Sequence, residues 1–196
     1  MDQKVAAVLG VGPGLGRAIS RRFAREDYAV GLMARGVEGL QEVREEIETN
    51  GGMALTVSTD ATDSGSVAQA FGQVRSELGA PEIFVYNAGA FQMGSILELS
   101  PERFDECLRI NCSGGFYGAQ QVLPAMVEKG YGTVLFTGAT ASLRGSANFS
   151  ALSTGKFGLR ALAQSMAREL GPQGVHVAHV VIDGQIDTPR VRKMSP

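Results

Sequence analysis

The sequence predicts an α/β protein built on a doubly wound parallel sheet. Short, unbroken apolar runs alternate with longer helix-like segments along the 196 residues. Each connection is long enough for a right-handed crossover between parallel strands. The first apolar run, at 5–9, leads into a glycine-rich turn and a helical segment, which favours a central first strand. We therefore expect six strands in the order 3-2-1-4-5-6, with a ligand crevice between strands one and four, where the order reverses.

The first half of the chain reads as three rounds of strand and helix. Apolar runs suited to strands that are covered on both faces occupy 5–9, 28–33 and 53–58. The helical segments that follow them run to about 26, from 38 to 49 and from 64 to 78. The second and third of these helices are closed by Asn, Gly and Pro residues, which tolerate or impose non-helical backbone.

The second half continues the alternation with longer helices. Strands are expected at 83–86, 133–137 and 175–182. Ser100 and Pro101 provide the cap and the first residue of one long helix, which runs to about Glu128. Another long helix spans about 151–170. No linker or repeat interrupts the pattern, so we expect a single domain over 1–196.

Composition and charge exclude several classes of partner. With 44% hydrophobic and 19% charged residues the chain resembles an ordinary soluble domain. A net charge of −2 with mixed signs provides no basic stripe for nucleic acid or an acidic membrane. The apolar run at 5–9 is too short for a signal peptide or a membrane span. A cytoplasmic protein with a small-molecule ligand is expected.

A metal centre is not expected. His176 and His179 fall in one predicted strand at an odd separation, so their side chains point to opposite faces and cannot bind one ion together.

Four glycines follow the first strand, at Gly10, Gly12, Gly14 and Gly16. A loop with so few β-carbons lets backbone N–H groups approach a pyrophosphate at the positive end of the next helix. The pattern G-x-G-x-x-G is not met, because Leu15 stands at its third glycine, and no Lys-Ser/Thr pair closes a phosphate-binding loop of the Walker type. The spacing present is G-x-x-x-G-x-G. The alternative is a tight turn that binds no ligand.

The residues after the second strand indicate which dinucleotide would bind. A site for the ribose 2′-hydroxyl of NAD would place Asp or Glu there, but this chain has Ala34 and Arg35. A guanidinium can hold a 2′-phosphate through forked, charge-assisted hydrogen bonds, which favours NADP. The alternative is that Arg35 is a solvated surface residue.

Over nearly its whole length the chain resembles the short-chain dehydrogenase/reductase family of Rossmann-fold enzymes. The family's glycine loop matches Gly10, Gly14 and Gly16, and its N-A-G motif after strand four matches 87–89. Its acidic residue after strand three, which holds the adenine amino group, matches Asp60. Its P-G-x-I-x-T motif, which binds the nicotinamide carboxamide, matches 183–188 with Asp in place of Pro.

The resemblance implies a set of cofactor-binding residues and a pair of catalytic ones. The cofactor-binding set is Gly10, Gly14, Leu15, Gly16, Arg35, Asp60, Ala61, Asn87, Ala88, Gly89, Lys156, Ile186 and Thr188. The catalytic pair comprises Asn111, which matches the family's active-site asparagine, and Lys156, which matches its lysine.

The family's acid and its carbonyl-polarising group have no match. In the family a Tyr four residues before the lysine donates a proton and a Ser after strand five polarises the carbonyl, but Leu152 and Ala139 stand at these positions. A phenol has a pKa of about 10 and needs a nearby cation to act as an acid near neutrality. Leu152 provides no phenol for Lys156 to activate.

A second spacing, Y-x-x-M-x-x-x-K, is similar to that of the family's divergent enoyl reductases. It places Phe149 where the Tyr would be, and so it also lacks a donor. Nearby hydroxyl groups could orient a water or a substrate oxygen, or could simply cap turns; they belong to Thr137, Thr140, Ser142, Ser150 and Ser153.

Two hypotheses about function follow. The first is NADP-dependent hydride transfer to a small carbonyl or conjugated substrate, with a proton from water or substrate held by Asn111 and Lys156. The second is a catalytically inert NADP-binding protein that senses cofactor or serves as a scaffold.

The resemblance also bears on assembly and on the end of the chain. The helices at about 101–128 and 151–170 carry apolar and small residues on more than one side, and in the family they form the main interface, so we expect a homodimer or homotetramer. Family members continue past I-x-T with a substrate-covering segment and a seventh strand. Only residues 189–196 follow here, so we expect either that the chain is truncated or that the covering segment and the seventh strand are absent.

Overall fold

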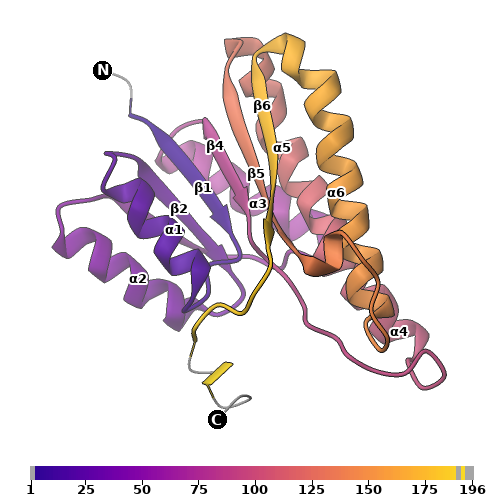
Figure 1. The fold of residues 1–196 in the computed structure, drawn as a ribbon. Helices are drawn as coiled ribbons and strands as arrows, with labels where there is room; N and C mark the ends of the chain where they lie inside the picture. Colours follow the sequence, from indigo (N-terminus) through magenta and orange to yellow (C-terminus); the bar gives the residue numbers. More distant parts are fainter. Residues whose placement is uncertain (1–2, 189–190, 193–196) are drawn as a thin grey trace.

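The computed structural model describes residues 3–188 and 191–192, and these form a parallel sheet with helices on both faces (Figure 1). The six strands pair in parallel in the order β3-β2-β1-β4-β5-β6, which confirms the predicted topology. Their bounds are β1 Val5–Leu9, β2 Ala29–Ala34, β3 Ala54–Ser58, β4 Ile83–Tyr86, β5 Gly132–Ala139 and β6 Val175–Ile182.

The helices divide between the two faces of the sheet. Helices α1 (Leu15–Ala24) and α2 (Val37–Thr49) pack on one face. The opposite face is covered by α3 (Ser64–Glu77), α5 (Gly114–Lys129) and α6 (Ser150–Leu170). Helix α4 (Pro101–Leu108) packs against α6, and in Figure 1 a long segment carries the chain from β4 to it. Short 3₁₀ turns span Thr140–Ser142 and Gly171–Gln173.

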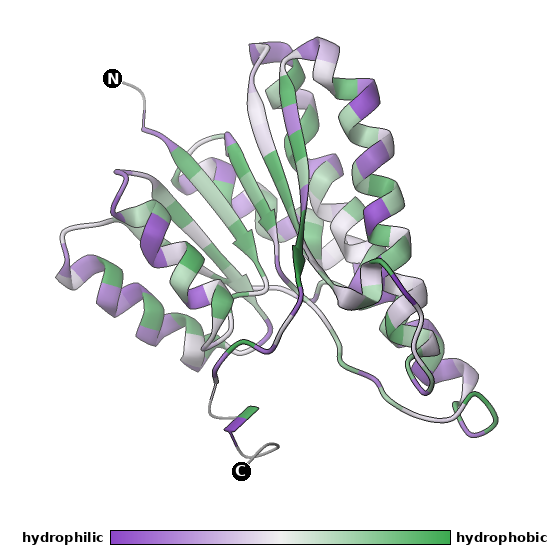
Figure 2. Ribbon diagram, in the orientation of Figure 1, coloured by the Kyte–Doolittle hydropathy of each residue, from purple (hydrophilic) through white to green (hydrophobic). Residues whose placement is uncertain are grey.

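Apolar residues concentrate in the strands, as Figure 2 shows for β1, β2 and β4. All five residues of β1 are buried, because helices cover both of its faces. The ring pairs Phe71–Phe84 and Tyr86–Phe136 pack edge to face under α3, α5 and α6. The carboxyl ends of β1 and β4 therefore lie at the edge of a closely packed apolar core.

The long helix predicted over 101–128 is not one α-helix. Residues Arg109–Ser113 form a π-helical turn between α4 and α5, and the N–H of Gly114 donates to Arg109 O, five residues back. The carbonyl of Ile110 is thereby released from the α-helical pattern, and the buried hydroxyl of Tyr86 donates to it. Sequence periodicity could not reveal this, because the partner that stabilises the turn comes from β4.

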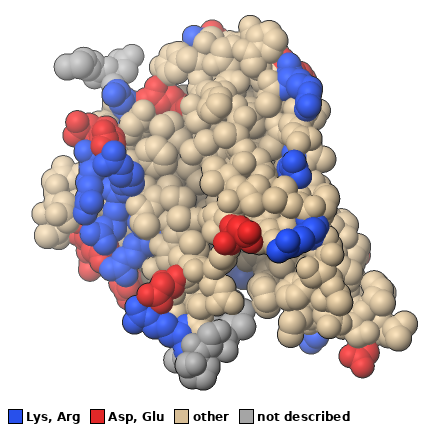
Figure 3. Space-filling model, viewed as in Figure 1, with Lys and Arg blue, Asp and Glu red and all other residues tan. Residues whose placement is uncertain are grey.

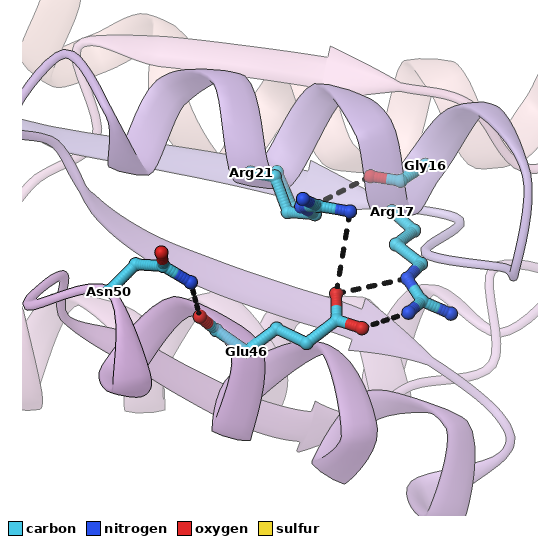
Figure 4. A network of polar contacts seen from close by, with 6 residues as sticks. Gly16, Arg17, Arg21, Glu46 and Asn50 are labelled. Carbon is cyan, nitrogen blue, oxygen red and sulfur yellow. Dashed lines mark hydrogen bonds and ion pairs between the residues drawn. The ribbon is translucent and has the colours of Figure 1, made fainter.

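Helices α1 and α2 are joined by an ion-pair cluster (Figure 4). The guanidinium of Arg17 donates two hydrogen bonds to the Glu46 carboxylate, and Arg21 lies 3.8 Å from the same group. Figure 3 shows basic side chains gathered on this side, with acidic ones among them. The pairing turns Arg17, which lies just after the glycine loop, towards α2.

The described residues contain no helix of the length and apolarity that a bilayer crossing requires.

Candidate functional site

A cavity of about 530 Å³ lies where β1 and β4 end, at the point where the strand order reverses. Twelve of the thirteen cofactor-binding residues expected from the sequence line it, namely Gly10, Gly14, Leu15, Gly16, Arg35, Asp60, Ala61, Asn87, Ala88, Gly89, Ile186 and Thr188. Gly12 and Ala34, which flank expected binding residues in the sequence, also line the cavity. The remaining lining residues were not expected from the sequence: Leu9, Val11, Thr59, Ala90, Phe91, Glu106 and Ile110.

The glycine loop is held against the N-A-G segment by close backbone contacts. Gly10 has a φ of +105°, and a β-carbon there would lie 2.2 Å from the N of Ala88. A β-carbon on Gly16 would lie 2.5 Å from Gly10 O. Backbone packing therefore requires both glycines whether or not a ligand binds. Gly12 differs, because a β-carbon there would meet nothing within 4 Å.

An acidic residue, Asp60, and a basic residue, Arg35, both line the first cavity. The N–H and hydroxyl of Thr62 donate to Asp60 Oδ1 at 2.9 and 2.8 Å. These hydrogen bonds lower the pKa of Asp60, and the positive charge of Arg35 adds to the effect. Asp60 is therefore an ionised acceptor at neutral pH. Arg35 is exposed and lines the same cavity.

A chain of hydrogen bonds runs beneath the cavity. Asn87 donates from Nδ2 to Gly10 O at 2.8 Å, and the hydroxyl of Thr137 donates to Asn87 Oδ1 at 3.0 Å. The ammonium of Lys156 donates to Thr137 O at 2.9 Å. Three strands and α6 are thus connected through polar groups. The sequence marked Thr137 only as a nearby hydroxyl and did not indicate its position in this series of hydrogen bonds.

Asn111 and Lys156 each lie close to Gly89. A β-carbon on Gly89 would lie 3.4 Å from Asn111 Oδ1 and 3.7 Å from Lys156 Nζ. Neither residue is part of the cavity lining. Burial lowers the pKa of Lys156 to about 8, since the charged form loses hydration.

The side-chain amide of Asn111 forms hydrogen bonds with backbone groups. Its Nδ2 donates to Ala90 O at 2.9 Å and to Cys107 O at 3.0 Å. Its Oδ1 accepts a longer contact of 3.4 Å from the N–H of Ala90. The amide therefore fixes the loop after β4 to the π turn. These contacts provide a structural role for Asn111 without any ligand.

A second cavity, of about 480 Å³, lies next to the first, and Phe91 lines both. Ala139, Phe149 and Leu152 line it. The three positions at which the resemblance would place a catalytic serine or tyrosine therefore face the same cavity. Its other lining residues are Thr140, Ala141, Arg144, Ser146, Ser153, Ile182, Gly184, Gln185 and Val191. The segments that form it come together only in the fold.

Some of the hydroxyl groups near the second cavity form hydrogen bonds within the structure and others do not. Thr140 donates to Asp183, and the Oγ of Ser142 accepts from the N–H of Ala139 at 3.1 Å. Ser150 and Ser153 each bury an Oγ that pairs with no described group.

Tyr86 is the buried phenol closest in sequence to the N-A-G segment, and it does not face either cavity. Its hydroxyl donates to Ile110 O. Burial raises the pKa of Tyr86 far above its usual value. Tyr86 is therefore a structural group and not a substitute acid.

The family model for short chain dehydrogenases matches residues 4–196. The chain belongs to the short-chain dehydrogenase family. Two relatives are 3-oxoacyl-[acyl-carrier-protein] reductases. MabA of Mycobacterium avium is 32% identical over 190 residues, which cover 95% of this chain and 69% of that protein. FabG of Escherichia coli (strain K12) is 30% identical over 195 residues, which cover 99% and 78%.

A further relative of this short-chain dehydrogenase is the L-2,3-butanediol dehydrogenase of Corynebacterium glutamicum. It is 32% identical over 188 residues, which cover 94% of this chain and 72% of that protein. The family is thus represented here by oxidoreductases with different substrates.

Solved structures of other family members have the same fold. A short-chain dehydrogenase from Rhodopseudomonas palustris superposes with a TM-score of 0.88 at 37% identity, and the match covers 96% of this chain and 87% of that one. A metagenomic short-chain oxidoreductase in complex with NADP also gives a TM-score of 0.88, at 30% identity and with coverage of 92% and 82%.

Proposed function

We propose that this short-chain dehydrogenase binds NADPH and reduces a small carbonyl or conjugated substrate through an active site that lacks the family's usual tyrosine and serine. The observation that carries the proposal is the pair of adjoining cavities. One is lined by the glycine loop, Asp60 and the N-A-G segment, and the other by Ala139 and Leu152, with Phe91 shared between them.

The residues of the first cavity fit a dinucleotide with a 2′-phosphate. The glycine loop exposes backbone at the N-terminus of α1, with open space above Gly12, which suits a pyrophosphate. Asp60 is an ionised acceptor for an adenine amino group, and Arg35 is an exposed donor beside it. Ile186 and Thr188 lie against the loop at Gly14, on the side where a nicotinamide amide would bind. The cofactor, when bound, supplies the hydride.

The proton must come from a group other than a tyrosine. Leu152 occupies the position one helical turn before Lys156, and Ala139 offers only backbone groups. Lys156, whose pKa lies at about 8, is a cation next to this region at neutral pH. Its role in the proposal is to hold a ribose hydroxyl and to raise the acidity of a water or substrate group nearby.

A second candidate function is an inert NADP-binding sensor or scaffold. The contacts of Asn111 and Lys156 favour it, because the Asn111 amide donates to two backbone carbonyls and the Lys156 ammonium donates to one. Neither residue then needs a catalytic role to explain its presence.

Stopped-flow measurement of NADPH oxidation across aldehydes, ketones and enones distinguishes the two candidates. The reductase predicts turnover with at least one class, and calorimetric titration of NADPH provides the binding control. NADPH binding without oxidation of any substrate would favour the sensor or scaffold.

Assembly as a homodimer or homotetramer is part of the proposal. Phe116 on α5 and Phe157 on α6 leave large parts of their rings exposed. An apolar pairing surface formed by these helices accounts for exposure that would otherwise be unfavourable.

A further inference from the structure

The second cavity is apolar over most of its lining. Phe91, Phe149, Leu152, Ile182 and Val191 surround it. The rings of Phe91 and Phe149 meet edge to face, with centroids 5.6 Å apart. Such walls favour a hydrocarbon body and reject a heavily hydroxylated one, because hydroxyl groups would lose their hydrogen bonds to water there.

One lining residue carries a charge, and that charge is positive. Arg144 is exposed, and among the described residues no carboxylate lies within ion-pair distance of its guanidinium. No Asp or Glu lines the cavity. Asp183 follows the lining residue Ile182, but its carboxylate accepts a hydrogen bond from Thr140. An anion that enters this space would therefore find Arg144 available and no acidic side chain in the wall.

One lining residue has an unused polar group. Ser153 is 7% exposed, and its Oγ is buried without a hydrogen-bond partner among the described residues. An unpaired buried hydroxyl is costly, and the neighbouring wall residue Leu152 cannot supply a partner. Rotation about the Cα–Cβ bond of Ser153 would turn this hydroxyl from its buried position towards a ligand oxygen against this part of the wall.

We propose that the second cavity selects a substrate with an apolar body that ends in a carboxylate, which Arg144 binds, and that Ser153 donates to an uncharged oxygen of the same molecule. This inference rests on the proposed function, because it names the substrate class of the same site. It excludes sugars and small neutral alcohols as preferred ligands. A short-chain aliphatic oxo acid has the required chemistry.

The test compares 7-oxooctanoate with its methyl ester, which has the same body without the charge. Titration calorimetry on the full chain, with and without NADPH, measures the two affinities. We expect the acid to bind about tenfold more tightly than the ester, since charge-assisted hydrogen bonds are roughly twice as strong as neutral ones. Arg144→Gln should remove most of that difference and leave ester binding unchanged.

Matched variants distinguish carboxylate binding at a specific site from a general effect of positive charge on binding. Arg168→Gln removes an exposed guanidinium from α6 that donates to Gln164 O and does not line the cavity, so it should change neither affinity. Ser153→Ala should weaken acid and ester equally, by about threefold to tenfold. Loss of an unpaired hydroxyl does not threaten folding, and a thermal melt verifies this.

The outcomes for the cavity and for the proposed function are distinguishable. Equal affinities for acid and ester, acid binding unaffected by Arg144→Gln, or no binding of either probe would overturn the inference, whether or not NADPH is oxidised. Acid binding that depends on Arg144 but gives no NADPH oxidation would support the inference and contradict the reductase. Ester and acid affinities that are unchanged by Ser153→Ala would remove Ser153 from it.

Discussion

The ammonium of Lys156 lies 2.9 Å from the carbonyl oxygen of Thr137 and donates a hydrogen bond to it. The hydroxyl of the same threonine donates to Asn87, and Asn87 in turn donates to Gly10 O. The lysine is thus fixed relative to the glycine loop through one residue of β5. This arrangement sets the position of the cation before any ligand binds.

The stability of the protein should rise with pH because of Lys156. Its pKa is lowered from 10.5 to about 8, so between these values the unfolded chain binds more protons than the folded one. The free energy of unfolding then increases with pH across that window. The shift corresponds to about 3 kcal/mol. Urea unfolding near pH 7 and near pH 10 should show this rise relative to Lys156→Met. A constant difference between the two proteins would contradict it.

Removal of the Arg35 guanidinium should weaken NADPH binding selectively. Arg35→Ala should raise the dissociation constant of NADPH about tenfold or more, as expected for loss of a charge-assisted contact. NADH, which lacks the 2′-phosphate, should be unaffected. Calorimetric titration of both cofactors measures the effect. Arg22→Ala is the control, because this exposed arginine pairs with Glu26 and lies outside the cavity. Equal losses for both cofactors would exclude Arg35 from phosphate recognition.

Restoring the missing groups should create or raise carbonyl reductase activity. In the variant Leu152→Tyr, Ala139→Ser, both new hydroxyls would face the second cavity. The matched control is Leu152→Phe, Ala139→Ser, which differs by one oxygen. A positioned acid contributes about 10²- to 10⁴-fold, so the tyrosine variant should exceed the control about a hundredfold or more on a simple aldehyde. NADPH absorbance follows the reaction. No gain in a folded, NADPH-binding variant would favour the sensor or scaffold.

Charge on the exposed rings of α5 and α6 should break the oligomer. Phe116 is 43% exposed and Phe157 is 42% exposed, and Phe116→Glu, Phe157→Glu places two carboxylates in the proposed contact. Light scattering should show at least a dimer for the natural sequence and a monomer for this variant. Val37→Glu, at a position that is 53% exposed on α2, should leave the mass unchanged. A monomer of the natural sequence at micromolar concentration would refute the interface.

The central strands were predictable from the sequence because they are buried on both faces. Such strands are continuous apolar runs, and 5–9 and 83–86 match the observed bounds to the residue. The prediction at 175–182 also matches, although β6 is an edge strand with several exposed residues. Helix ends were also readable where a cap was present, as with Ser100 and Pro101. Twelve of the positions lining the first cavity were expected from the sequence, because the family motifs lie at the ends of strands.

The remaining features depend on contacts between distant segments. The second cavity combines Phe91, Arg144 and Val191, and no spacing along the chain relates these residues. The π turn depends on the hydroxyl of Tyr86, which looks like any other apolar ring in a hydropathy pattern. The backbone partners of Asn111 arise from the loop after β4. These features exist only in the folded chain.

The hydroxyl of Tyr86 contacts the helical segment that follows β4 at two backbone positions. It donates to Ile110 O, and a β-carbon on Gly114 would lie 2.3 Å from the Tyr86 hydroxyl oxygen. Exchange of Tyr86 for Phe, ordinarily a conservative substitution, would leave a carbonyl unpaired in the core and favour a return of the turn to α-helical spacing. Asn111, within that turn, would then rotate away from Ala90. In evolutionary terms, residues 86 and 114 are epistatic, and drift at either of them would reach the site through the helix register.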